Sequence, residues 1–109
     1  MYYILDEDNF PVYATLHEKH IWEAKNPDKV IVRQETFKDV FISTAFIGIK
    51  DIFYETVVIG NTKYDGISKT CTFLDAAKLN HRSFKELIIE EKYGKILGFF
   101  YNLFNIFKS

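Results

Sequence analysis

The sequence predicts an α+β fold: a mostly antiparallel sheet of four to five strands, with a short N-terminal helix, a long helix near 73–92 and an aromatic C-terminal helix. Residues 40 to 60 read VFISTAFIGIKDIFYETVVIG and form two runs rich in the residue types that favour strands. The polar pair Lys50-Asp51 separates the runs, a pattern typical of an antiparallel hairpin. Apolar residues at helical spacing between 76 and 88 predict the long helix.

The first run, Val40–Ile49, is apolar on both of its faces. One face carries Val40, Ile42, Thr44 and Phe46, and the other carries Phe41, Ser43, Ala45, Ile47 and Ile49. A strand covered on one side only would alternate apolar and polar residues. We therefore expect a central strand with another element packed on each face. The second run, Ile52–Ile59, alternates better and has Glu55 as its lone charge.

The first third of the chain predicts two extended segments and a helix. The extended segments are Tyr2–Leu5 and Phe10–Tyr13, the second because a residue before proline avoids the helical region. Thr15 and Glu18 have the spacing of a capping box, which predicts that a helix starts there. Pro27 is expected to end this helix.

The middle of the chain predicts a meander followed by a loop. Lys29–Phe37 is predicted to be a strand that turns at Lys38-Asp39 into the central strand. Asn61–Lys69 is polar and is predicted to be a loop before the long helix. We expect the long helix and the N-terminal helix to share one face of the sheet. The tail helix would then cover the opposite face of the sheet or bind a partner protein.

The tail, Lys95–Ser109, is predicted to be a separate helix, because Gly94 suits the position after a helix C-terminus. Apolar residues cover most of its circumference. We accordingly divide the chain into an α+β domain, 1–94, and an amphipathic C-terminal helix, 95–109. Three interpretations remain open: packing on the second sheet face, a partner or oligomer interface, or a membrane-surface position. The candidate partner-interface residues are Phe99, Phe100, Leu103, Phe104 and Phe107.

Size and charge narrow the classes of function. The chain has 109 residues, enough for one domain, and a net charge of −1, which argues against a protein that coats nucleic acid. Cys71 is the single cysteine, so no internal disulfide is expected. The start MYYILDEDNF lacks the basic region of a signal peptide. No run reaches the roughly 18 apolar residues of a membrane span.

No motif specifies a reaction, and we predict neither an enzyme nor a cofactor. His17 and His20 lie three apart rather than the four of a zinc-protease helix, so a metal site would need His81 or Glu55 as a third ligand. We favour the interpretation that His17 and His20 are exposed side chains on a helix rather than metal ligands. A nucleophilic set would consist of Cys71, His81 and Asp75. A small packing cysteine is the more common role for such a residue.

Acidic and basic residues offer two further interpretations. A carboxylate pair for acid–base chemistry would join Glu55 to Asp65 or Glu35. A lone charge on a strand is more often a residue that faces solvent or protects a sheet edge. A nucleotide or nucleic-acid site would use Arg33, Lys38, Lys63, Lys69 and Arg82. Stacking aromatics for such a site would be Phe37, Phe41 and Tyr64, which core packing explains more simply.

Two segments resemble the paired strands of a family of small, uncharacterised phage and prophage proteins. Ser43–Ile49 and Tyr54–Gly60 are similar to STVFLGL and FETMVFGG of that family. The other similar segments are Tyr3–Asp6, Trp22-Glu23, Thr72-Phe73 and Asp75-Ala76. The family's longer loop between the strands is reduced here to Lys50-Asp51. The resemblance implies a phage origin, expression inside an infected bacterium and a small α+β domain, and it carries no activity.

These observations favour a non-enzymatic phage accessory protein that binds a host component, such as a defence or host-takeover inhibitor. We expect it in the cytoplasm of the infected bacterial host, with a host or phage protein as its partner. One alternative is a minor virion or assembly protein that forms a homo-oligomer through its C-terminal helix. Another is a nucleotide or nucleic-acid binding module.

Overall fold

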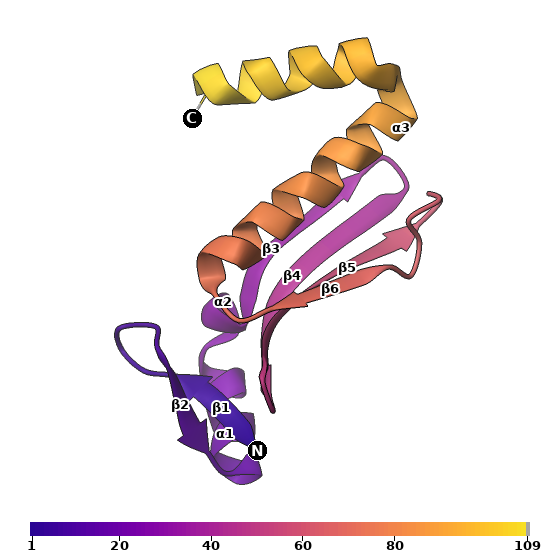
Figure 1. The fold of residues 1–109 in the computed structure, drawn as a ribbon. Coiled ribbons are helices and arrows are strands. Elements are labelled where there is room, and N and C mark those ends of the chain that lie inside the picture. Colours follow the sequence, from indigo (N-terminus) through magenta and orange to yellow (C-terminus); the bar gives the residue numbers. More distant parts are fainter. Residues whose placement is uncertain (109) are drawn as a thin grey trace.

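The structure is a computed structural model that describes the backbone of residues 1–108 and the side chains of residues 1–94. It confirms the α+β fold, with helices packed on an antiparallel sheet (Figure 1). The elements in chain order are β1 (Tyr2–Leu5), β2 (Pro11–Ala14), α1 (Leu16–Lys25), α2 (Pro27–Val30), β3 (Ile31–Phe37), β4 (Val40–Ile49), β5 (Ile52–Gly60), β6 (Ser68–Cys71) and α3 (Leu74–Lys108).

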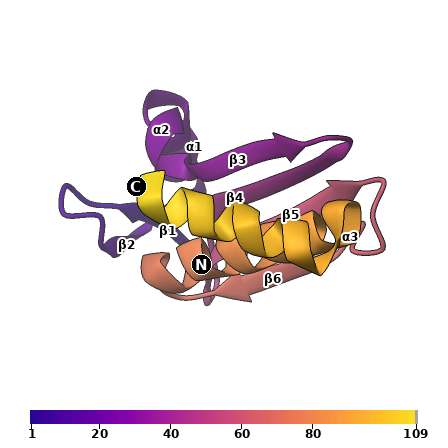
Figure 2. The same cartoon turned by 90° about the horizontal axis from the view of Figure 1, so that it is seen from above.

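Strand β4 is central, as the sequence predicts. It pairs with β5 along one edge, and with β3 and β1 along the other. Figure 2 shows β3, β4, β5 and β6 side by side with α3 above them. The turns on both sides of β4 place a lysine in the left-handed region, Lys38 with φ 56° and Lys50 with φ 55°. Few residues other than glycine adopt this conformation, so the turn type was not evident from the sequence.

The two helices α1 and α3 share one face of the sheet, as expected. Every second residue of β4 is buried on this face. Phe84 and Ile88 of α3 pack on the end of β4 that carries Ile42. At the other end, Trp22 of α1 meets Phe46 with ring centroids 5.8 Å apart. Helix α3 and helix α1 therefore divide the length of the central strand between them.

The opposite face of β4 and β5 has no covering element within residues 1–94, so the prediction of an element on each face is wrong for this part of the chain. Phe41 and Ala45 are half-buried there, and Ile59 is 55% exposed. Phe41 lies directly across from Ile59 and Ala45 from Glu55. Side chains in such cross-strand pairs shield one another. An apolar face on a central strand therefore does not require a second layer.

Three local features differ from the sequence-based expectations. Pro27 ends α1 and also begins the short helix α2, because proline is favourable at the first helical position. Strand β3 accordingly starts at Ile31 rather than at Lys29. The polar segment after β5 contains a sixth strand, β6, which pairs Cys71 with Tyr54. The capping box of α1 is present as predicted.

Helix α3 consists of two limbs that meet at Gly94. This residue has φ 80° and ψ 166°, outside the helical region, where the sequence predicts a helix end. Figure 1 shows the sharp turn there, after which the helical backbone continues to Lys108. The side chains of the candidate partner interface, Phe99, Phe100, Leu103, Phe104 and Phe107, lie outside the described residues. The division into 1–94 and 95–109 stays a prediction.

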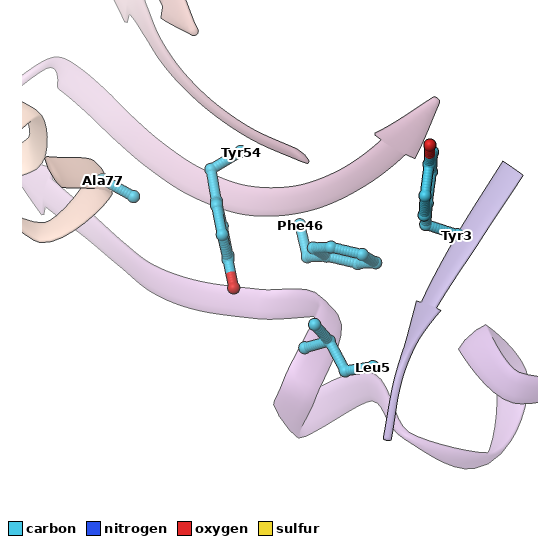
Figure 3. Packing of buried hydrophobic residues seen from close by; sticks show 5 residues of the cluster. All are labelled: Tyr3, Leu5, Phe46, Tyr54 and Ala77. Atoms are coloured by element: carbon cyan, nitrogen blue, oxygen red, sulfur yellow. The ribbon is translucent and has the colours of Figure 1, made fainter. Parts of the chain in front are cut away.

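Two apolar clusters form the core. One contains Tyr3, Leu5, Phe46, Tyr54 and Ala77 (Figure 3). The other contains Val40, Ile42, Val58, Phe84 and Ile88. On each of β4, β5 and α3, a buried polar residue lies between the two clusters along the chain: Thr44, Thr56 and His81. A polar layer thus crosses the interface between α3 and the sheet.

Candidate functional site

The polar layer is the most connected group of polar side chains in the described part of the protein. Thr44 is 0%, Thr56 is 1% and His81 is 2% exposed. The two hydroxyl oxygens lie 2.7 Å apart, and Thr44 Oγ1 lies 2.8 Å from His81 Nδ1. Thr44 and Thr56 are direct cross-strand partners on β4 and β5. The pairing of the strands therefore brings the hydroxyls together, and α3 adds the imidazole.

The layer reaches the surface through Glu35 of β3. His81 Nε2 lies 2.9 Å from Glu35 Oε1. The same carboxylate receives Arg33 Nε at 2.8 Å and Lys85 Nζ at 2.8 Å. Glu35 is half-buried, and Arg33 is mostly exposed. One carboxylate thus joins a buried imidazole from α3 to two cations near the surface.

Protonation follows from these contacts. Burial lowers the pKa of His81 below its ordinary value of 6.5, and this outweighs the opposite effect of Glu35. Burial raises the pKa of Glu35, but hydrogen bonds from Lys85 and His81 outweigh burial, so the pKa lies below 4.5. The charge of Arg33 acts in the same direction. At neutral pH the imidazole is therefore neutral and the carboxylate is ionised.

These charge states set the direction of each hydrogen bond. An ionised carboxylate only accepts, so His81 Nε2 carries the proton and donates to Glu35. The other ring nitrogen then accepts, so Thr44 donates its hydroxyl proton to Nδ1. Thr44 has no second proton, so Thr56 must donate to Thr44. The chain runs in one direction, from Thr56 through Thr44 and His81 to Glu35.

The order hydroxyl, imidazole, carboxylate is also that of a catalytic triad, in which the histidine takes the proton of a nucleophilic hydroxyl. Here the Thr44 hydroxyl has no exposed surface, and its oxygen is already occupied by Thr56. A substrate carbonyl cannot approach it while α3 is in place. The arrangement instead links α3 to the sheet, because a satisfied buried network favours one packing arrangement over others.

The nucleophilic set proposed from the sequence is not assembled. His81 bonds to Thr44 and Glu35 rather than to Cys71 or Asp75. Burial raises the pKa of the Cys71 thiol, which lies 3.5 Å from the carbonyl oxygen of Phe73. A thiol with a raised pKa is a poor nucleophile at neutral pH. Cys71 packs partly buried beside the cluster that contains Tyr54.

The residues proposed for a metal site are also apart. His17 and His20 are exposed on α1, whereas His81 of α3 is buried between that helix and the sheet. Within the described residues, no group of three or more His, Cys, Asp or Glu side chains is arranged to hold a metal ion. Glu55 and Glu35 point to opposite faces of the sheet, because they pair with Ala45 and Ile42, which alternate along β4.

The basic and aromatic residues proposed for nucleotide binding also lie apart, because some are on the helix-covered face of the sheet and others are on the opposite face. Phe37 packs beside the cluster under α3, whereas Phe41 lies on the opposite face. The ammonium groups of Lys38 and Lys63 lie over the rings of Tyr93 and Tyr64, at 4.3 and 5.3 Å from the centroids.

No helix in the described part of the chain is long and apolar enough to cross a membrane.

Sequence reasoning missed two buried polar residues on helices. His81 falls in line with Ala77, Phe84 and Ile88 at helical spacing, and this spacing is the signal that would have placed it in the core. Lys19 is 3% exposed and donates to the carbonyl oxygen of Tyr3 at 3.0 Å. Burial lowers the pKa of Lys19. No signal in the weakly patterned α1 sequence predicts its burial.

The uncovered sheet face is a second candidate. We define the open face as Phe41, Ser43, Ala45, Glu55, Val57 and Ile59, which form three cross-strand pairs on β4 and β5. Polar residues border it on both neighbouring strands, Gln34 and Thr36 on β3 and Ser68 and Thr70 on β6. Four of the six residues of the open face are apolar, and an apolar patch with a polar rim is the usual composition of a protein interface.

The chain matches no protein-family model, no curated protein and no solved structure. The similarity of Ser43–Ile49 and Tyr54–Gly60 to phage and prophage strands therefore stays a prediction. The geometry of the polar layer and the open face is the basis for a functional proposal.

Proposed function

We propose that this chain is a non-enzymatic protein-binding module whose partner docks on the open face. The supporting observation is that the open face is mostly apolar, with Ile59 55% exposed, and is bordered by polar residues on β3 and β6. The fully sealed Thr44 hydroxyl supports a structural rather than a catalytic role for the polar layer. The resemblance to phage strands supports a host protein in an infected bacterium as the partner.

The charge on the open face favours a particular partner surface. Glu55 is its one charged residue and lies across from Ala45, in the pair at one end of the face. A partner with a lysine or arginine within an apolar surface would pair with this carboxylate. The open face of a second copy of the chain contains no lysine or arginine to pair with Glu55. Charge complementarity therefore favours a different protein over self-association.

The test compares substitutions at two residues of similar exposure on opposite sides of the molecule. Ile59 on the open face is 55% exposed, and Leu79 on α3 is 59% exposed. Tagged wild-type protein captures partners from a host lysate, and each purified partner is then titrated against the Ile59→Lys and Leu79→Lys variants. We expect Ile59→Lys to weaken binding by about tenfold or more, and Leu79→Lys to leave it nearly unchanged. Equal effects of the two substitutions on every captured partner would contradict the proposal.

The alternative function, a virion or assembly protein that oligomerises through its C-terminal helix, is favoured by the largely apolar sequence of a helical segment. Substitution of Phe100 and Phe104 by glutamate tests it, with mass measured by light scattering. An oligomer that the substitutions convert to a monomer would support assembly. A wild-type monomer would remove the basis for this alternative and leave the open face as the candidate.

A further inference from the structure

A pocket of about 270 Å³ lies where β1, α2, β3, β5 and the start of α3 meet, on the helix-covered side of the sheet. Its apolar lining comes from Leu5, Ile31, Val32 and Leu74. The volume is that of about nine water molecules, the size of a small organic molecule rather than of a folded partner. Neither the polar layer nor the open face includes these residues.

The pocket contains a tyrosine hydroxyl with no hydrogen-bond partner among the described residues. Tyr54 lines the pocket and is 3% exposed. Figure 3 shows the hydroxyl end of its ring pointing toward Leu5, another lining residue. No described side chain or backbone group forms a hydrogen bond with this hydroxyl. No fully buried side-chain oxygen in the described residues lacks a partner, so the hydroxyl oxygen must have some surface open to the pocket. The hydroxyl is therefore available to a molecule in the pocket.

The hydroxyl is suited to donate. Burial raises the pKa of Tyr54, and the nearby Cys71 acts in the same direction, so the phenol keeps its proton at neutral pH. A hydrogen bond from a neutral donor to an ionised oxygen is stronger than one to a neutral oxygen. An anionic oxygen is thus the acceptor that would benefit most from this position.

The charges around the pocket favour the same ligand. Two lysines, Lys29 and Lys78, line it, against one carboxylate, Asp28. Helix α3 begins at Leu74, so the amide groups of its first turn lie beside the pocket. Amide groups at a helix N-terminus favour negative charge. The electrostatic potential in the pocket is therefore positive, next to a lining of apolar side chains.

We propose that this pocket binds a small organic carboxylate with an apolar body. The carboxylate accepts a hydrogen bond from Tyr54 and lies within reach of Lys29 and Lys78. The apolar body packs on Leu5 and Leu74. This site is independent of the protein-binding proposal, because the open face lies on the other side of the sheet.

Titration followed by amide NMR tests the site with benzoate as the probe and neutral benzamide, of nearly the same shape, as the control ligand. We expect benzoate to shift amide signals of residues 28 to 32 and 74 to 78, and benzamide to bind far more weakly. The substitution Tyr54→Phe keeps the ring and is expected to weaken benzoate binding about tenfold. Tyr64→Phe, at a partly buried tyrosine outside the pocket, is the matched control.

Two charged residues that line the pocket, Lys78 and Asp28, provide an independent pair of variants if Tyr54→Phe disturbs the core. Lys78→Met is expected to weaken benzoate binding about threefold, and Asp28→Asn to strengthen it by a similar factor. Opposite effects of these two substitutions support the site. Equal binding of benzoate and benzamide, no shift at either segment, or an unchanged affinity in both rim variants would overturn the proposal.

Discussion

The direction of the hydrogen bonds in the polar layer predicts unequal effects of two chemically identical substitutions. Thr44→Val and Thr56→Val each replace a buried hydroxyl by a methyl group of similar size, at positions that are 0% and 1% exposed. Burial and volume change are therefore the same. The difference lies in which groups lose their partners, because Thr44 is in the middle of the chain and Thr56 is at its start.

The expected magnitudes follow from counting these groups. Thr44→Val leaves the Thr56 hydroxyl without its acceptor and His81 Nδ1 without its donor. Each unpaired buried group costs about 1–3 kcal/mol, so we expect the two together to lower the free energy of unfolding by about 2–6 kcal/mol. Thr56→Val removes a donor but leaves the bond from Thr44 to His81 intact, so we expect a loss of about 1 kcal/mol.

Urea unfolding at neutral pH, followed by circular dichroism, measures both losses as shifts of the midpoint at constant slope. Thr36→Val on the exposed rim of the open face is the control and should change stability by no more than about 0.5 kcal/mol. A Thr56→Val variant that is as destabilised as Thr44→Val, or more so, would refute the direction assigned to the chain. It would also refute the neutral form of His81 from which that direction follows.

Three further predictions concern pH, backbone conformation and thiol reactivity. Folding lowers the pKa of His81 below 6.5 and that of Glu35 below 4.5, so the folded state binds fewer protons than the unfolded state. The free energy of unfolding of the wild-type protein should therefore fall as the pH drops from about 7 to 5. The decrease should be smaller in the His81→Leu variant. Thermal unfolding should show that Gly48→Ala, at φ +61° with a new Cβ 2.7 Å from a β1 carbonyl oxygen, loses about 2–4 kcal/mol. Gly66→Ala, at φ +79° in open space, should lose about 1 kcal/mol. Iodoacetamide should alkylate Cys71 more slowly than free cysteine at neutral pH, because burial raises the pKa of this thiol.

Local signals in the sequence predicted most of the secondary structure. The β-branched and aromatic composition of Val40–Ile49 and Ile52–Gly60 predicted both strands of the central hairpin, because these residue types favour strands. Thr15 and Glu18 form the capping box that their spacing predicts. Gly94 interrupts α3 at the expected position. In each case the cause lies within a few residues of its effect.

The polar layer could not be predicted in the same way. It depends at once on the register of β4 with β5, on the register of β3 with β4, and on the position of α3 along the sheet. The two-residue turn at Lys50-Asp51 and the irregularity next to it set Thr44 opposite Thr56. The docking of α3 then decides which of its residues lies over that pair. The strand β6 was missed for a similar reason, since Ser68–Cys71 is polar and becomes a strand only through pairing with β5.

The polar layer connects the two proposed binding surfaces. Apolar contacts alone would allow α3 to slide along the sheet, because the hydrophobic effect has no direction. A displacement of one helical turn would separate His81 from both Thr44 and Glu35 and leave buried polar groups unpaired, so the network favours one register. On β5, Tyr54 lies two residues before Thr56, and on α3, Lys78 lies three residues before His81. The same register therefore positions the hydroxyl and the lysine of the pocket. It also holds β4 and β5 fixed from one side, so the open face on the other side is presented to a partner already in its bound shape, which reduces the entropy lost on binding.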